Sequence, residues 1–175
     1  MTVIRRVVSG HDKEGRAVVA SDEQLSGLDI PGMSGFEILN IWGSDQTHQY
    51  PYDGSKPDYQ NFFAPVGGYR FLIFTVPPDS PIEVNEGDKP PSEMEAKFPG
   101  LLQTFKPDAP GMHRSATVDL LYVIEGRCEL ELDDGERVSL GAGDTFIQSG
   151  TMHAWRNPFD VQCKIIGVIV GAEVS

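Results

Sequence analysis

Long hydrophobic runs are missing from this chain of 175 residues. No apolar stretch approaches the roughly 20 residues that a membrane-spanning helix needs, and the first residues, MTVIRR, lack the apolar core of a secretory signal. Positive charge is also scarce, since 14 Lys and Arg residues stand against 26 Asp and Glu residues, for a net charge of −12. Nucleic acids and anionic lipid surfaces attract basic proteins, so we expect neither as a partner.

Cysteine is rare as well. The two cysteines, Cys128 and Cys163, lie in different β-rich segments and lack the short spacing of a metal-binding pair. We interpret them as buried thiols. Because disulfide bonds form mainly in oxidising compartments, this pattern favours a cytoplasmic location. At this length one domain is expected, with enough residues to bury a full core.

Short β-rich segments separated by turn residues make up the second half of the chain. Residues 128–132 alternate polar and apolar side chains, and the Asp133-Asp134-Gly135 stretch that follows is a hairpin signal. Further turns at 141–144 and 149–150 divide the remainder into equally short segments. Such short, regularly spaced strands are typical of a closed barrel or a double-sheet jelly roll. We therefore predict an all-β fold with at most one or two short helices.

The first hundred residues contain fewer strands and one long irregular segment. We predict that residues 1–100 form a β-rich extension packing on a barrel core at 101–175, within one structural domain. The expected elements are a hairpin from strands at 3–9 and 16–20, strands at 36–42 and 69–76, a short helix within 90–98, and a central strand at 161–170. Segment 44–68 is rich in Pro and aromatic residues and is too long for a simple connection, so we interpret it as a lid or a docking arm.

Three residues of the second half have the chemistry of metal ligands. His113, Asp119 and His153 supply two imidazoles and one carboxylate, the facial set of non-haem iron(II) sites. A straight strand would hold His113 and Asp119 roughly 20 Å apart, whereas metal–ligand bonds measure about 2 Å. The chain must therefore turn between them, and the short, polar residues 114–117 are suited to that turn.

Asp119 also stands out through its neighbours. It alternates with Leu121 and Val123, so the three side chains are predicted to point to the same side of one strand. Burying a lone carboxylate among apolar groups is costly. The pattern therefore predicts a metal ion or a hydrogen-bonding partner for Asp119.

These residues resemble the first signature motif of the cupin superfamily. That motif has His-x-His, an acidic residue a few positions later, and a Gly seven positions after the acid. In this sequence His113 matches the first histidine, and Gly126 follows Asp119 by seven positions. The chain departs from the motif twice, because Ser115 replaces the second histidine and Asp119 replaces the glutamate.

The second cupin motif is matched further along. It runs Gly-Asp, then Pro-x-Gly, His and Asn, and the matching residues here are Gly143, Asp144, Gly150, His153 and Asn157, with Gln148 at the proline position. The two motifs cover about the last third of the chain. The resemblance implies a cupin jelly-roll barrel, also called a double-stranded β-helix, which often holds a metal in its mouth.

The resemblance also implies the chemistry of the site. The ligand set His113, Asp119 and His153 is similar to the His–Glu–His set of cupin dioxygenases, with iron the first expectation and manganese, nickel or zinc as alternatives. In an oxygenase, the iron keeps positions open for substrate and O₂. In an isomerase or lyase, the ion polarises a carbonyl group, and Asp119, where it is not a ligand, acts as a general base. Asp119 and His153 are the catalytic candidates.

Other residues are candidates for the substrate pocket, namely Ser115, Gln148 and Trp155. Trp155 shares the parity of His153, so it either walls a pocket or plugs the barrel. Arg70, Arg114 and Arg156 are each able to bind a substrate carboxylate through two hydrogen bonds, and the alternative for each is an ordinary surface charge.

Two classes of function stay open. One is a metal-dependent enzyme acting on a small organic molecule. The other is a non-catalytic barrel that binds a small ligand, with a degenerate, metal-free site, which the loss of the second motif histidine favours. In either case cupin relatives commonly pair their barrels, and the apolar segments 3–8 and 69–76 resemble sheet edges. We therefore expect a homodimer that uses the amino-terminal strands.

Overall fold

The computed structural model describes residues 1–79 and 91–174, and it has the predicted all-β, jelly-roll architecture. In chain order the strands are β1 (Val3–His11), β2 (Ala17–Ser26), β3 (Leu28–Asp29), β4 (Glu37–Ser44), β5 (Tyr69–Val76), β6 (Thr117–Glu125), β7 (Arg127–Glu131), β8 (Arg137–Gly141), β9 (Thr145–Ser149), β10 (Ala154–Arg156) and β11 (Cys163–Gly171). One α-helix, α1 (Pro91–Lys97), and two 3₁₀ turns, Leu102–Thr104 and Asp133–Gly135, complete the described elements. Within these residues, no helix combines the length and the apolar character needed to cross a bilayer.

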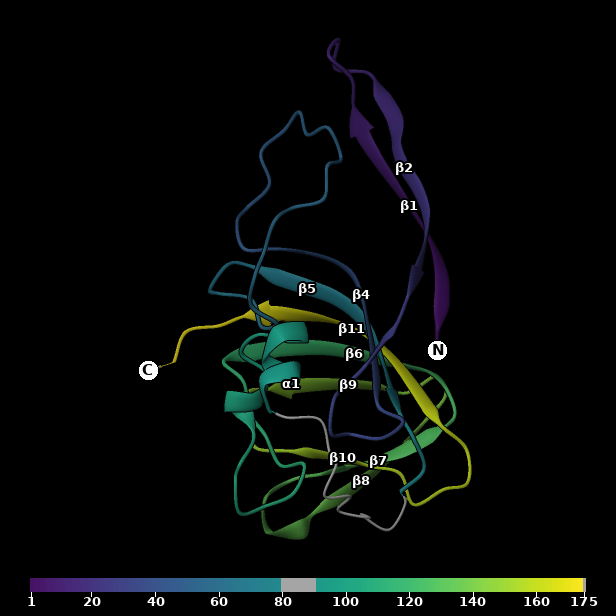
Figure 1. Ribbon diagram of the computed structural model, residues 1–175, viewed down its shortest axis with the longest axis vertical. Coiled ribbons are helices and arrows are strands. Elements are labelled where there is room, and N and C mark those ends of the chain that lie inside the picture. Colours follow the sequence, from purple (N-terminus) through teal and green to yellow (C-terminus); the bar gives the residue numbers. More distant parts are fainter. Residues whose placement is uncertain (80–90, 175) are drawn as a thin grey trace.

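Two sheets stack to form the barrel (Figure 1). The larger sheet has the order β3-β4-β5-β11-β6-β9, and the smaller has the order β10-β7-β8. Apolar side chains from both sheets meet between them and exclude water. We call this cluster the closed end, and its members are Val76, Leu121, Val123, Cys128, Leu130, Leu140, Cys163 and Ile165. Cys128 and Cys163 are free and buried there, as the prediction of buried thiols required.

Strand β11 is central, as its β-branched sequence predicts. It pairs antiparallel with β5 on one side and with β6 on the other, and alternate residues from Cys163 onward are buried. The prediction of a strand at 69–76 matches β5 at both ends. Its use as a dimer edge is wrong, because β5 is hydrogen-bonded to β4 and β11 along both sides. An apolar strand of this kind is suited to an interior position in a sheet covered on both faces.

The boundary predicted at residue 100 does not separate two layers. Strands β4 and β5 come from the first hundred residues, yet they belong to the same sheet as β6, β9 and β11. The part of the first hundred residues that forms a separate sheet is the β1–β2 hairpin. The barrel is therefore built from both halves of the chain.

The β1–β2 hairpin projects from the barrel, with its tip far from the sheets (Figure 1). It forms where the sequence predicts a hairpin, and its pairing extends over nine residues of β1. At its base, Ile4 and Leu25 pack against Leu39, Ile41 and Ile73 on the outer face of the large sheet. Near its tip, the backbone N–H of His11 donates to the carbonyl of Tyr52 at 2.8 Å. Both ends of the hairpin are thus attached to the rest of the protein.

The expected lid or docking arm, 44–68, begins one residue later as segment 45–68, because Ser44 is the last residue of β4. Arg70 holds this segment. This arginine of β5 is 1% exposed, so its interpretation as a surface charge is wrong. Its guanidinium donates to the carboxylate of Asp45 at 2.6 Å and to the carbonyl of Asn61 at 2.9 Å, and it stacks on the Tyr59 ring at 4.0 Å. A buried guanidinium is stable only when its N–H groups are paired, and this segment supplies those partners.

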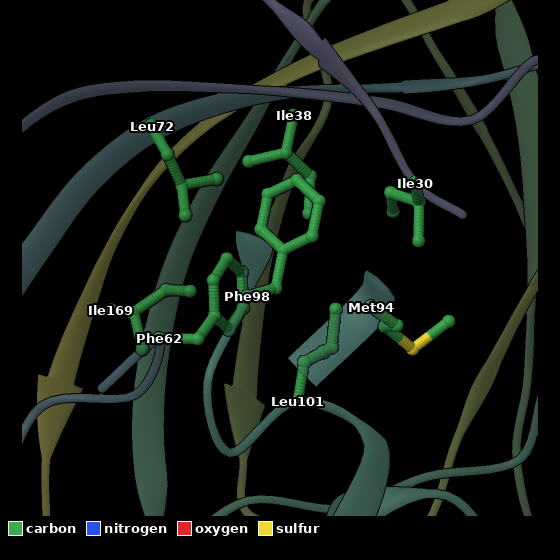
Figure 2. Packing of buried hydrophobic residues seen from close by; sticks show 8 residues of the cluster. All are labelled: Ile30, Ile38, Phe62, Leu72, Met94, Phe98, Leu101 and Ile169. Carbon is green, nitrogen blue, oxygen red and sulfur yellow. The ribbon is translucent and has the colours of Figure 1, made fainter. Parts of the chain in front are cut away.

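Helix α1 and the residues after it cover one end of the barrel with apolar side chains (Figure 2). The helix lies within the predicted range 90–98, and Pro90 falls outside the described residues. Phe98 meets Phe62 edge-to-face, with ring centroids 5.9 Å apart. We call the whole group the cover cluster, and its members are Ile30, Ile38, Phe62, Leu72, Met94, Phe98, Leu101 and Ile169.

Candidate functional site

A cavity of about 610 Å³ lies beneath the cover cluster, at the end of the barrel opposite the closed end. One part of its wall is apolar and aromatic, and comes mostly from residues 30–105. Its polar groups come mostly from the motif region, and His113, Ser115, Asp119, His153 and Arg156 are among them. A largely apolar pocket with a few convergent polar groups is the usual form of a small-molecule site.

The two motif histidines are directly paired. The backbone N–H of His113 donates to the carbonyl of His153 at 2.8 Å, and the reverse bond measures 3.0 Å. This antiparallel bridge brings the two rings together, with centroids 4.2 Å apart and planes tilted by 48°. Residues far apart in sequence are thus adjacent in the cavity wall, as a shared site requires.

Each histidine is oriented by a backbone carbonyl two residues before it. His113 Nδ1 lies 2.9 Å from the oxygen of Gly111, and His153 Nδ1 lies 3.0 Å from the oxygen of Thr151. A carbonyl oxygen only accepts hydrogen bonds, so Nδ1 of His113 carries the proton of that ring. The lone pair of His113 is then on Nε2, the arrangement of a metal ligand or of a proton acceptor. Nδ1 of His153 faces both the Thr151 carbonyl, which accepts, and the Gln148 amide, which donates.

Burial keeps both rings uncharged. Desolvation lowers the pKa of His153 to about 4, and the neighbouring His113 adds to that effect. The pKa of His113 is also lowered by burial, against a small opposing effect of its bond to Gly111. Two protonated rings in contact would repel each other, so at neutral pH both present a free lone pair.

Asp119 lies on the inner face of β6 with Leu121 and Val123, as predicted. It is 7% exposed, and within the described residues its Oδ1 has no hydrogen-bond partner. Desolvation raises the pKa of its carboxyl group to about 6, with a smaller opposing effect of the Thr117 hydroxyl. The described part of the chain therefore leaves one oxygen of this buried acid unsatisfied, which is unusual for a buried polar group.

The three predicted pocket residues occupy different places. Ser115 lines the cavity, and its hydroxyl is 2.6 Å from that of Thr117. Trp155 also lines it and packs edge-to-face against His153, with centroids 6.2 Å apart. It contacts the closed-end cluster as well, so it acts both as pocket wall and as plug.

Gln148 lies behind His153 rather than among the cavity-lining residues. It is 1% exposed, its amide donates to the carbonyl of Thr151 at 2.8 Å, and its Oε1 accepts from the Thr151 hydroxyl at 2.9 Å. The same amide is in contact with His153 Nδ1. Gln148 therefore anchors the turn that orients His153.

A divalent metal fits these residues by donor type. Two uncharged imidazoles and an unsatisfied carboxylate oxygen are ligands that iron(II), manganese, nickel and zinc accept. By geometry the set is incomplete: within residues 1–79 and 91–174, no three His, Cys, Asp or Glu side chains converge closely enough to enclose an ion. Closing a three-ligand site would require side-chain rotation, and the assignment of His113, Asp119 and His153 as ligands stays a prediction.

Apart from Trp155, the aromatic residues of the cavity wall were not identified from the sequence. Phe105 packs against the His113 ring with centroids 5.1 Å apart, and Phe74 lies 5.3 Å from Trp155. Phe62 and Phe63 enter from segment 45–68. The abundance of aromatic residues in that segment was a signal, but nothing in their spacing indicates which of them reach the cavity.

The comparisons with known proteins agree with the motif region. A family model described as the cupin domain matches residues 101–169. Oryzines biosynthesis cluster protein J of Aspergillus oryzae is 49% identical over 53 residues, which cover 30% of this chain and 30% of that protein. The cupin-domain-containing oxidoreductase srdB of Neurospora crassa is 45% identical over 56 residues, which cover 30% and 29%. The chain thus matches about a third of the length of these relatives.

Among solved structures, one similar protein is a cupin 2 conserved barrel domain protein from Salinispora arenicola. The alignment covers 82% of each chain, with 17% sequence identity and a TM-score of 0.45.

Proposed function

Because the chain belongs to the cupin superfamily, we propose that it is an enzyme acting on a small, largely apolar organic molecule at His113, Asp119 and His153. The observation that supports this most is that a single cavity holds two uncharged imidazoles, a buried carboxyl group and an aromatic wall. Relatives named as an oxidoreductase and as a biosynthesis cluster protein support a role in small-molecule metabolism.

The side chains of this site are suited to moving protons in a water-poor environment. With a pKa of about 6, the Asp119 carboxyl group is mostly ionised at neutral pH, where it acts as a proton acceptor, and mostly protonated in mild acid, where it acts as a proton donor. The Nε2 atom of His113 accepts a hydrogen bond or a proton from a substrate hydroxyl. Because the rings of His113 and His153 are in contact, a positive charge on one ring disfavours a positive charge on the other.

Substrate orientation follows from the division of the wall. An apolar or aromatic body packs against Phe74, Phe105 and Trp155, and a polar substituent is directed to the histidine pair. When a metal ion is bound, it supplies Lewis-acid or redox chemistry, and the residues proposed to hold it are His113, Asp119 and His153.

A non-catalytic ligand-binding barrel is the second candidate. Two observations favour it: Ser115 occupies the place of the second motif histidine, and no closed three-ligand set is formed within the described residues. In that case the same cavity binds a small molecule without transforming it.

Metal content and thermal melting test the proposal. The purified protein is expected to hold up to one equivalent of iron, manganese, nickel or zinc, and its melting temperature should rise with added metal and fall with chelator. His113→Ala and His153→Ala should reduce the metal content sharply. His11→Ala removes a histidine outside the cavity and should retain it.

The outcomes separate the two candidates. Metal retained in the His113→Ala/His153→Ala double variant would show that the ligands are assigned wrongly. A parent protein that melts at the same temperature with iron(II), zinc or chelator, together with an Asp119→Asn variant of higher stability, would contradict the metal-dependent enzyme. That result would support the ligand-binding barrel.

A further inference from the structure

A second cavity of about 500 Å³ adjoins the first and is more open to solvent. We call it the vestibule. It shares Phe63, Phe105 and Ser115 with the main cavity, and the rest of its lining is polar or small: Asn61, Gly100, Gln103, Thr104, Lys106, Arg114 and Ala116, with Met152 as the exception. The two cavities therefore share part of their lining, including two phenylalanine side chains.

Arg114 is the unusual residue of the vestibule. In the described part of the chain every other arginine has an acidic or aromatic partner; the pairs are Arg5 with Asp22, Arg6 with Glu23, Arg16 with Asp12, Arg70 with Asp45, Arg127 with Phe159, Arg137 with Glu129, and Arg156 with Glu131. No such partner receives the guanidinium of Arg114 within those residues. Its backbone is nevertheless fixed, because its N–H donates to the carbonyl of Thr104 at 3.2 Å. The backbone of Arg114 is thus held in place, while its guanidinium is left without an acidic or aromatic partner among the described residues.

The two charged side chains that line the vestibule, Arg114 and Lys106, are both basic. The ammonium group of Lys106 forms an exposed ion pair with Asp108, at 3.7 Å. The described lining contains no Asp or Glu. Glu95, the acid that reaches the rim, already accepts hydrogen bonds from Gln103 and from the backbone of Gly100. In a chain with a net charge of −12, this is a local site for an anion.

The main cavity has the opposite preference. Two buried acids, Asp119 and Glu37, line it, and its arginine, Arg156, is already bonded to Glu131 at 2.6 Å. An anionic group placed there would face Asp119 without a free cation, which is costly at low dielectric. A molecule with an anionic head and an apolar body would therefore put its head in the vestibule and its body in the main cavity.

We propose that the vestibule is an anion-recognition site in which Arg114, assisted by Lys106, binds the carboxylate of an organic acid whose apolar body passes Phe63 and Phe105 into the main cavity. The inference deepens the proposed function and rests on it, because it names the substrate class of that cavity. Arg114 acts as a specificity-determining residue: it binds the end of the molecule remote from the histidine pair. A planar guanidinium matches the two oxygens of a carboxylate.

Matched probes test this without relying on turnover. The probes are 4-phenylbutanoate and octanoate, each compared with its neutral primary amide, and binding is measured by titration calorimetry on the Asp119→Asn variant and on the parent. Each acid is expected to bind at least about tenfold more tightly than its amide. Arg114→Gln should abolish that preference and leave amide affinity unchanged, and Arg114→Lys should retain part of it. Lys56→Gln, which removes an exposed cation from segment 45–68, is the charge-matched control.

The failures of this inference and of the proposed function are distinguishable. Equal affinity for acid and amide in the parent, or no binding of either probe, would overturn the vestibule site. So would an Arg114→Gln variant that weakens acid and amide alike while melting at the parent temperature. A third outcome is also informative: the preference for acids depends on Arg114, but the metal content is unchanged in the His113 and His153 variants. That outcome would support the vestibule site and contradict the metal-dependent enzyme.

Discussion

The two ends of the barrel are built from the same strands and yet differ completely in content. At the closed end Val123 of β6 and Ile165 of β11 are 2% and 0% exposed among apolar neighbours. At the other end the same strands place Asp119 and Ile169 on the wall of a cavity. The inward-facing positions of the same strands therefore form a packed apolar core at one end and the wall of a cavity at the other. The difference is made by a few side chains and not by the backbone.

The largest expected effect comes from truncating the closed end. Leu130→Ala removes a fully buried side chain from a tightly packed cluster and should lower the free energy of unfolding by about 2–5 kcal/mol. Leu101→Ala, a truncation of equal size beside the cavity, should cost less because its neighbourhood is already partly hollow. Urea denaturation of both variants measures this, and equal losses would contradict the contrast between the ends.

A pH series on chelator-treated protein sharpens the contrast at the open end. The rise in the Asp119 pKa from 3.8 to about 6 means that its contribution to stability is complete below about pH 4 and is lost as the pH rises through 6. The lowered pKa of His153, about 4 against 6.5, acts in the opposite direction, because its contribution is complete above about pH 6.5 and is lost as the pH falls toward 4. The two effects nearly cancel in the parent.

Single variants should separate the pH dependence of stability that each group contributes. Between pH 8 and pH 4.5, Asp119→Asn should lose about 2 kcal/mol of stability relative to the parent, after an advantage at pH 8. His153→Gln should gain a similar amount relative to the parent over the same interval. Denaturant midpoints at several pH values measure both, and parallel curves for parent and variants would show that these groups titrate normally.

The smallest expected effect on folding concerns the outer face of the same strand. Leu120 and Tyr122 of β6 and Ile147 of β9 are exposed on the outer face of the large sheet, and we propose that this face, together with the β1–β2 hairpin, forms a homodimer interface. Leu120→Lys should change folding stability by no more than about 0.5 kcal/mol and convert a dimer to a monomer in light scattering. An intact dimer in that variant would place the interface elsewhere.

Much of the strand pattern was predictable because it depends on residues that are close together in the sequence. The alternation in β6, the β-branched run of β11 and the hairpin around residues 11–15 depend on neighbouring residues. The juxtaposition of His113 and His153 in the cavity wall was predictable for another reason, namely the spacing of two family motifs. Neither source of information extends to contacts between distant segments.

The features that were missed all depend on such contacts. The sequence does not show that β5 pairs on both sides, because strand pairing is decided by partners far along the chain. From the sequence alone Arg70 is interpreted as a surface charge, because its hydrogen-bond acceptors come from a distant segment. Within the described residues, no closed ligand set forms around Asp119. This depends on side-chain orientation, which the spacing of residues in the sequence does not determine.

Through Arg70, the shape of the main cavity depends on a part of the chain that contributes none of the motif residues. By binding the carbonyls of Asn61 and Phe63, Arg70 fixes the stretch from which Phe62 and Phe63 enter the cavity. That stretch lies outside residues 101–169, the region shared with the family. Two proteins with the same motif residues can therefore admit different molecules to this cavity, through differences in segment 45–68.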